Sequence, residues 1–347
     1  MTFARASLYG FLGLIAVSAA HAQPESQGEL HIVTSLKPIE LLARAIAPED
    51  TRVTTLVPGG GSPHTYQMRP SERKALEQAD VIFWVGPEME TFLDRILAGD
   101  DFSDRAVSLA GDRTWAEDSK ARANDHPDQG HQASHSSEAR QEHDHSGDHD
   151  GHIEEPSPSS GQHDHHGHDH GDGEDPHVWL DPALAAGMAE RIHQRLSAMN
   201  KVEQATLDQN LDRFLKELAQ AEQTIHDRLN TPAVRDVSIF TYHDAFGRFA
   251  EHYGLSIAGV LTASPERTPG AKHLAEVQGK LADAKQPCLL TEPQFNRKWW
   301  RSITENIEIQ MSTWDPLASD ISADAGGYVD FQFALADAVL SCLPEQP

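Results

Sequence analysis

Short apolar runs alternate with stretches of helical periodicity through the first third of the chain. Runs rich in Val, Ile, Leu and Phe, each stopped by Gly, Pro or a polar cluster, predict buried strands. The predicted strands cover residues 30–36, 53–57, 81–85 and 106–109. The predicted helices cover residues 38–47, 70–79 and 88–98. Strands that alternate with helices are typical of an α/β fold, in which helices cover both faces of a parallel sheet.

The same alternation returns after residue 176, and it begins with two predicted helices at 182–200 and 202–230. The later predicted strands cover residues 237–241, 257–261, 288–291 and 307–314, and the later helices cover 245–253, 270–284 and 328–342. We therefore expect two Rossmann-like β/α lobes with parallel sheets, at 23–200 and 231–347, joined by one long α-helix at 201–230. A cleft between two such lobes is a common place for a ligand.

The first 22 residues have the pattern of a secretory signal peptide. Arg5 supplies a positive start, an apolar run follows, and Ala20-His21-Ala22 is a small-x-small cleavage site. The run is shorter than the ~20 apolar residues of a membrane-spanning helix, although an uncleaved anchor is the alternative. We expect a mature chain that starts near Gln23 and resides in the periplasm.

Between residues 118 and 175 the pattern collapses, because His, Asp, Gly, Ser and Pro replace nearly all large apolar residues. Such a segment cannot bury enough apolar surface to offset its ordering entropy, so we expect a disordered loop. Alternating imidazoles and carboxylates suit weak, exchangeable binding of Zn²⁺, Cu²⁺ or Ni²⁺. The alternative is a solvated spacer with adventitious metal affinity. The candidate auxiliary metal ligands are His143, His145, His149, His163, His165, His166, His168 and His170.

Charge and cysteine content narrow the classes of function. The formal net charge is −26, which excludes a nucleic-acid binder because phosphates would repel the chain, and which favours cations. Cys288 and Cys342 are an even pair, which outside the cytoplasm suggests one disulfide, with two buried free thiols as the alternative.

Three histidines stand apart from the His-rich segment. His64 follows the second predicted strand, His177 lies between two prolines, and His243 ends the first strand of the second lobe. Ligands of open parallel sheets bind outside the carboxyl ends of the strands, so these side chains can converge on the cleft. Neutral imidazole is the commonest metal ligand and binds Zn²⁺ at ~2.0–2.1 Å. Taken singly, a histidine at such a place is more often a polar residue in a turn than a metal ligand.

Three neutral ligands leave the charge of a divalent ion uncompensated. Asp315, after the last predicted strand, is our candidate for the fourth ligand, and a water is the alternative. The carboxylates expected to orient the imidazoles are Asp181, Asp244 and Glu292.

Three motifs in this order resemble the metal-binding proteins of ABC importers, of the ZnuA-type (cluster 9 or cluster A-I solute-binding proteins). They are Gly-Gly-Gly-Ser-Pro-His-Thr-Tyr at 59–66, Asp-Pro-His-Val-Trp-Leu-Asp-Pro at 175–182 and Tyr-His-Asp-Ala-Phe at 242–246. Shorter matches are Ser-Pro-Glu at 264–266, Glu-Pro-Gln-Phe at 292–295 and Asp-Pro-Leu at 315–317.

The resemblance implies a monomeric periplasmic protein that binds metal between two lobes and delivers it to an inner-membrane permease. It also implies His64, His177 and His243 as ligands, and a C-terminal disulfide between Cys288 and Cys342. Manganese members place a carboxylate where His243 stands, so this chain resembles the zinc members. It departs from some of them at Pro63, where they have a Glu that can ligate.

The sequence leaves competing functions open. Three histidines and a water also form catalytic zinc sites, but no His-Glu-x-x-His motif is present and no general base stands beside the ligands, so we expect no enzyme. A zinc storage or chaperone protein that acts mainly through the His-rich loop is the main alternative, and a secreted adhesin is another.

Overall fold

The computed structural model describes residues 29–110, 175–262, 269–295, 301–305 and 307–344. The predicted signal peptide and the eight auxiliary histidines lie outside the described residues. Within the described ranges, no helix combines the length and the apolar character that a membrane crossing requires.

The N-terminal lobe is a parallel four-stranded sheet in the order β2-β1-β3-β4. Its strands are β1 (His31–Thr34), β2 (Arg52–Thr55), β3 (Val81–Trp84) and β4 (Ala106–Ser108). Its helices are α1 (Lys37–Ile46), α2 (Pro70–Gln78) and α3 (Thr91–Leu97). Every residue of β1 and β3 is buried, as expected for central strands that helices cover on both faces.

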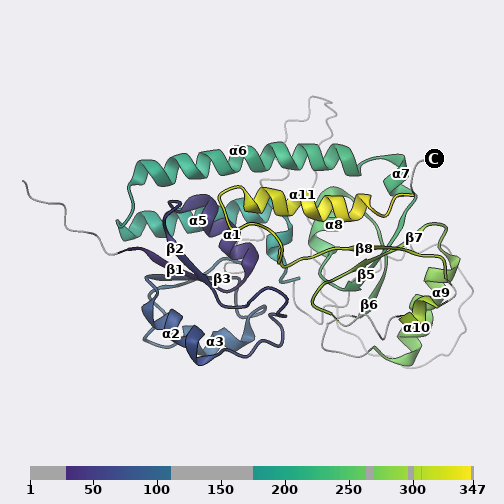
Figure 1. Ribbon diagram of the computed structural model, residues 1–347, viewed down its shortest axis with the longest axis horizontal. Coiled ribbons are helices and arrows are strands. Elements are labelled where there is room, and N and C mark those ends of the chain that lie inside the picture. The colour runs from purple at the N-terminus through teal and green to yellow at the C-terminus, as the bar shows by residue number, and fades with distance from the viewer. Residues whose placement is uncertain (1–28, 111–174, 263–268, 296–300, 306, 345–347) are drawn as a thin grey trace, which may run out of the picture.

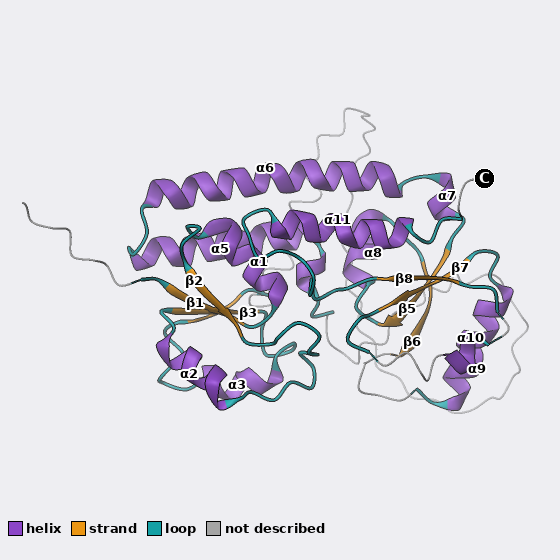
Figure 2. Cartoon of the chain, viewed as in Figure 1, coloured by secondary structure: helices purple, strands orange, loops and turns teal. Residues whose placement is uncertain are grey.

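The C-terminal lobe repeats this topology, with a parallel four-stranded sheet in the order β6-β5-β7-β8. Its strands are β5 (Ser238–His243), β6 (Ile257–Thr262), β7 (Pro287–Thr291) and β8 (Gln310–Thr313). Its helices are α7 (Pro232–Arg235), α8 (Gly247–Tyr253), α9 (Ala271–Asp283) and α10 (Arg301–Thr304). The expected pair of parallel β/α lobes is therefore confirmed (Figure 2).

Four further elements of the described residues connect the lobes. The 3-10 turn η1 (Val178–Leu180) leads into α5 (Pro182–Met199), and the long α6 (Gln204–Leu229) then crosses above both lobes (Figure 1). The last helix, α11 (Gly327–Leu340), returns beneath α6 and also reaches from one lobe to the other. Two helices therefore span the lobes, where the sequence predicts only one.

One apolar core runs through both lobes. It joins residues of β1 and α1 to residues of β5, α8 and α11, whereas the outer faces of the two sheets have separate, smaller cores. Gly327 shows how closely α11 approaches α1, because a Cβ there would lie 2.9 Å from the Leu41 side chain and closer still to the Ser322 carbonyl. Only glycine fits at this position.

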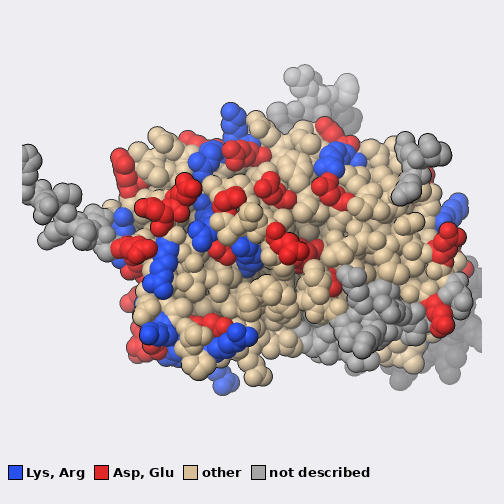
Figure 3. All heavy atoms as spheres, viewed as in Figure 1, with Lys and Arg blue, Asp and Glu red and all other residues tan. Residues whose placement is uncertain are grey.

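Charged side chains of both signs are interspersed over the N-terminal lobe and α6 on the face shown in Figure 3. The acidic excess is concentrated elsewhere in the chain, because residues 111–174 contain 16 Asp and Glu against four Lys and Arg. That segment alone accounts for −12 of the net charge of −26.

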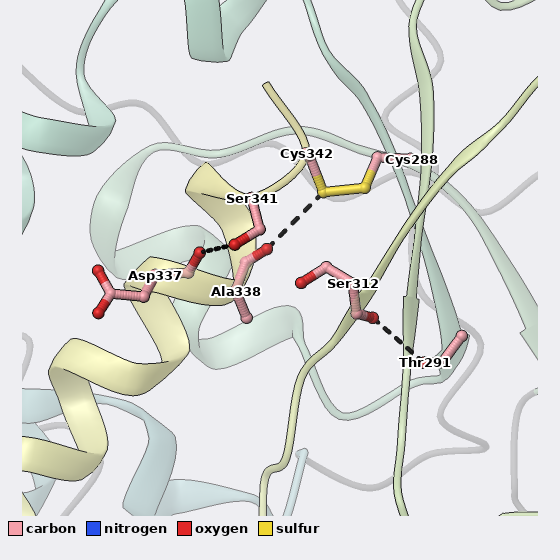
Figure 4. The surroundings of a disulfide bond; sticks show 7 residues. All are labelled: Cys288, Thr291, Ser312, Asp337, Ala338, Ser341 and Cys342. Atoms are coloured by element: carbon pink, nitrogen blue, oxygen red, sulfur yellow. Dashed lines mark hydrogen bonds between the residues drawn. A yellow bond between two sulfur atoms is a disulfide. The ribbon is translucent and has the colours of Figure 1, made fainter. Parts of the chain in front are cut away.

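A disulfide closes the C-terminal lobe. Cys288 in β7 is bonded to Cys342, two residues beyond the end of α11, which confirms the expected pairing (Figure 4). Both cysteines are buried, and the Cys342 Sγ also lies 3.8 Å from the carbonyl oxygen of Ala338 in α11. The bond therefore holds the end of α11 against the sheet.

Candidate metal centre

The three histidines singled out by the sequence meet between the lobes. His64, His177 and His243 each offer a ring nitrogen, and these three atoms lie within 4.8 Å of one another. Their ring centroids are 5.4–6.0 Å apart, with tilted or edge-on planes. His64 is half-buried and the other two are buried. The arrangement suits a single metal ion that three imidazoles hold.

The loop that carries His64 is shaped by its glycines and proline. Gly60 has φ +79°, in the left-handed region that side chains disfavour, and the Gly61 N–H donates to the Pro58 carbonyl at 3.0 Å. Pro63 then fixes the backbone immediately before His64. The tight turn directs the histidine to the cleft, and nothing in it resembles a phosphate-binding loop.

His177 is oriented by the carboxylate two residues before it. Asp175 Oδ1 accepts from the His177 backbone N–H at 3.0 Å and lies 2.7 Å from the ring Nδ1. Burial alone would raise the pKa of Asp175, but hydrogen bonding to His177 and the nearby charge of Arg248 hold it below its usual value. An ionised Asp175 accepts the Nδ1 proton, which leaves the Nε2 lone pair available for a metal.

His243 has an equivalent partner on the neighbouring strand. Thr241 of β5 pairs with Leu290 of β7, so His243 lies beside Glu292 two residues further along. Glu292 Oε1 lies 2.5 Å from His243 Nδ1, and both side chains are buried. Glu292 is thus one of the three orienting carboxylates that the sequence predicts, and it acts on a ligand from the second lobe.

A small cavity lies at the convergence of the three rings. Its volume is about 10 Å³, which is close to the space that one water occupies. Its walls also include Pro63, Trp179, Gln294, Phe295, Pro316 and Leu317. A cavity of this size accommodates a single ion or a single water and excludes an organic substrate.

The structure does not bring Asp315 into this group. Its carboxylate oxygens accept from the backbone N–H groups of Leu317 at 3.0 Å and Ser319 at 2.7 Å. They stabilise a turn in which Ala318 has φ +52°. This turn presents the Pro316 carbonyl to Trp179 Nε1 at 2.7 Å, so Asp315 shapes the wall of the cavity. Among the described residues, the cluster contains no carboxylate ligand.

Two other predicted orienting residues have different places. Asp181 caps α5 by accepting from the N–H groups of Ala183 and Leu184, at 2.8 and 3.3 Å. Asp244 is buried next to His243 in the chain. Asp175 is not among the predicted orienting carboxylates, although a carboxylate two residues before a candidate ligand is a usable signal.

A second polar junction ties the lobes behind the metal centre. His252 of α8 reaches Asp181 Oδ1 at 3.2 Å with Nδ1 and Glu222 Oε1 of α6 at 3.0 Å with Nε2. Burial alone would lower the pKa of His252, but hydrogen bonds to both carboxylates and their charges raise it to about 9. Nearby, Arg248 donates to the Asp175 carbonyl with Nε at 3.0 Å and Nη2 at 2.6 Å.

Comparisons with known proteins identify the family. Residues 32–342 match the family described as zinc-uptake complex component A periplasmic, ZnuA. The high-affinity zinc uptake system protein ZnuA of Yersinia pestis is 33% identical over 331 residues, which cover 95% of this chain and 96% of that protein. The ZnuA protein of Haemophilus ducreyi is 32% identical, with 90% and 93% covered.

Solved structures share the fold. A zinc-bound crystal structure of a ZnuA deletion mutant matches with a TM-score of 0.65 at 22% identity, over 92% of this chain and 99% of that chain. The periplasmic zinc-binding protein TroA of Treponema pallidum matches with a TM-score of 0.64 at 18% identity, over 90% and 99%. Two parallel sheets, three converging histidines and a family match over nearly the whole chain lead to one conclusion: this chain belongs to the ZnuA family of periplasmic zinc-uptake components.

Proposed function

We propose that this protein captures Zn²⁺ in the periplasm and delivers it to the inner-membrane permease of an ABC-type zinc importer. The observation that carries the proposal is the group of three imidazoles within 4.8 Å of one another, two of them backed by carboxylates. The relatives named as high-affinity zinc uptake proteins support the same activity. In this proposal the protein works as a monomer and catalyses no reaction.

The donor set favours zinc over manganese. His64, His177 and His243 supply only imidazole nitrogen, and the described residues add no carboxylate to the group. Imidazole suits Zn²⁺, whereas Mn²⁺ prefers carboxylate and water oxygen. In this proposal a water completes the tetrahedral coordination of the ion as the fourth ligand.

The ligands come from both lobes, and this suggests how the ion is released. His64 belongs to the N-terminal lobe and His243 ends β5 of the C-terminal lobe, while His177 precedes η1 between them. A displacement of one lobe by the permease would separate His243 from His64 and weaken the site.

The decisive experiment removes the three imidazoles while the His-rich segment stays in place. We expect the H64A/H177A/H243A variant to lose high-affinity Zn²⁺ binding, measured by competition with a chromophoric chelator. A matched control is H193A/H226A/H273A, which removes three histidines that lie on α5, α6 and α9 outside the cavity. The control should bind one Zn²⁺ with unchanged affinity.

If the triple-alanine variant kept the affinity of the wild type, the proposed site would be wrong. Many equivalent weak sites in the wild type, without a single tight one, would instead favour zinc storage through the His-rich segment. Hydrolysis of ester or peptide substrates in proportion to zinc occupancy would point to an enzyme.

A further inference from the structure

Gln294 lies in the wall of the metal cavity, in the turn that follows β7. Its Nε2 donates to Glu292 Oε2 at 3.0 Å. Its Oε1 is buried and has no hydrogen-bond partner among the described residues. A buried carbonyl without a partner costs about 1–3 kcal/mol, so such an atom calls for an explanation.

The orientation of this amide is fixed by chemistry. Glu292 accepts from His243 Nδ1 with Oε1, and its Oε2 is an acceptor as well. A carboxylate oxygen cannot donate, so the NH₂ group of Gln294 must face Glu292 and the carbonyl oxygen must face away from it. One buried carboxylate therefore fixes both a ligand ring and the amide beside it.

Most other nearby acceptors are already engaged: Asp175 Oδ1 holds His177, both oxygens of Glu292 are used, and both oxygens of Asp315 accept from backbone N–H groups. Asp175 Oδ2 is also buried without a partner among the described residues, but Asp175 does not line the cavity, whereas Gln294 does. Zinc with three imidazoles requires one more ligand, and with no carboxylate in the group a water is the candidate. A metal-bound water donates hydrogen bonds, and an amide carbonyl is a pure acceptor.

We propose that Gln294 is a positioning and specificity-determining residue, whose Oε1 accepts a hydrogen bond from the water in the fourth coordination position of Zn²⁺. The proposal rests on the proposed function, because it assumes an ion among the three histidines. A neutral acceptor keeps the site free of a carboxylate ligand, and this disfavours ions that prefer anionic oxygen, such as Mn²⁺.

The first test replaces the amide by a side chain of similar length without the oxygen. Gln294→Met should weaken Zn²⁺ binding by about 10–100-fold, the usual effect of losing an outer-shell partner. It should also change the visible absorption spectrum of bound Co²⁺, which reports the ligand field and which a merely structural role would not alter. Gln310→Met makes the same chemical change on the exposed edge of β8 and should change neither quantity.

The second test introduces the carboxylate. Gln294→Glu should raise the affinity for Mn²⁺ relative to Zn²⁺ by about tenfold, because it offers an anionic oxygen at the fourth position. This variant keeps a polar side chain of the same size, so it decides the question if Gln294→Met fails to fold in circular dichroism.

The proposal is overturned if folded Gln294→Met binds Zn²⁺ within twofold of the wild type and its Co²⁺ spectrum is unchanged, or if Gln294→Glu leaves the Mn²⁺ to Zn²⁺ ratio unaltered. Even if the Gln294 proposal fails in this way, a wild-type protein that binds one Zn²⁺ tightly still supports the proposed function. A wild type without a tight site overturns the proposed function itself.

Discussion

At the candidate metal centre, two of the three histidines are each oriented by a carboxylate. Asp175 and Glu292 accept from the Nδ1 atoms of His177 and His243, so Nε2 of each ring is left for the ion. Such pairs keep each ring in one tautomer and one orientation before the metal arrives. The sequence predicts the three histidines as candidate ligands because each ends a strand or follows a constrained turn.

The role of a carboxylate is harder to predict from sequence at this scale. Asp315 and Asp175 both precede a proline, but the first accepts from backbone N–H groups and the second holds a histidine. The difference depends on which N–H groups the folded backbone brings near each carboxylate. The residues next to each carboxylate in the sequence do not determine which N–H groups these are.

His252 allows a prediction about pH, because its pKa is raised to about 9 from an ordinary value of 6.5. A raised pKa means that the contribution of His252 to the free energy of unfolding is fully present below pH ~6.5 and is lost as pH rises through ~9. We expect His252→Gln to lower the free energy of unfolding by about 3 kcal/mol at pH 6.5 and by much less at pH 10, in urea denaturation.

The control for this experiment is His193→Gln, which removes a pair with the half-exposed Asp208. Exposed pairs contribute under about 1 kcal/mol, so this variant should differ little from the wild type at either pH. Equal destabilisation by His252→Gln at pH 6.5 and pH 10 would show that its ion pairs do not stabilise the fold.

Among the elements, α11 is one of the helices that reach from one lobe to the other. It contacts α1 and α6, and its Tyr328 hydroxyl donates to the Trp179 carbonyl at 2.7 Å, beside the metal cavity. The sequence predicts this helix but not its position, because an apolar periodicity does not say which surface covers it. The short α7 and α10 also escape prediction, since four residues give too little periodicity.

The disulfide allows a prediction about the stability of the protein. Cys288 and Cys342 are 54 residues apart. Closing a loop of that length lowers the entropy of the unfolded chain, and this stabilises the folded state by about 4 kcal/mol. We expect the C288A/C342A variant to lose stability of that order in urea denaturation, with the metal-free protein. A loss below about 1 kcal/mol would mean that packing alone holds α11 in place.

At the scale of the whole molecule, the continuous core limits how far the lobes can move. Residues of β1, β5, α1, α8 and α11 share one apolar cluster, and α6 crosses above both lobes. Wide opening of the cleft would expose part of this core, so small displacements at the metal centre are the favoured route of release. The two-lobed fold is predictable from sequence because β/α alternation is a strong signal, but the shared core depends on long-range packing.

The His-rich segment carries the last prediction, which concerns the full chain in solution. Residues 126–170 contain twelve histidines, and the larger stretch 111–174 accounts for −12 of the net charge of −26, so both chemistry and charge attract divalent cations. Deleting residues 126–170 should reduce the total zinc bound at saturation and leave the affinity of the single tight site unchanged.

A second variant with all twelve histidines changed to Asn keeps the length and the charge, and it should lose the same weak sites if imidazoles form them. Zinc titration followed by isothermal calorimetry separates the two classes of site. Unchanged total zinc after the deletion would rule out a binding role for the segment, whereas retained weak sites in the Asn variant would assign them to the carboxylates.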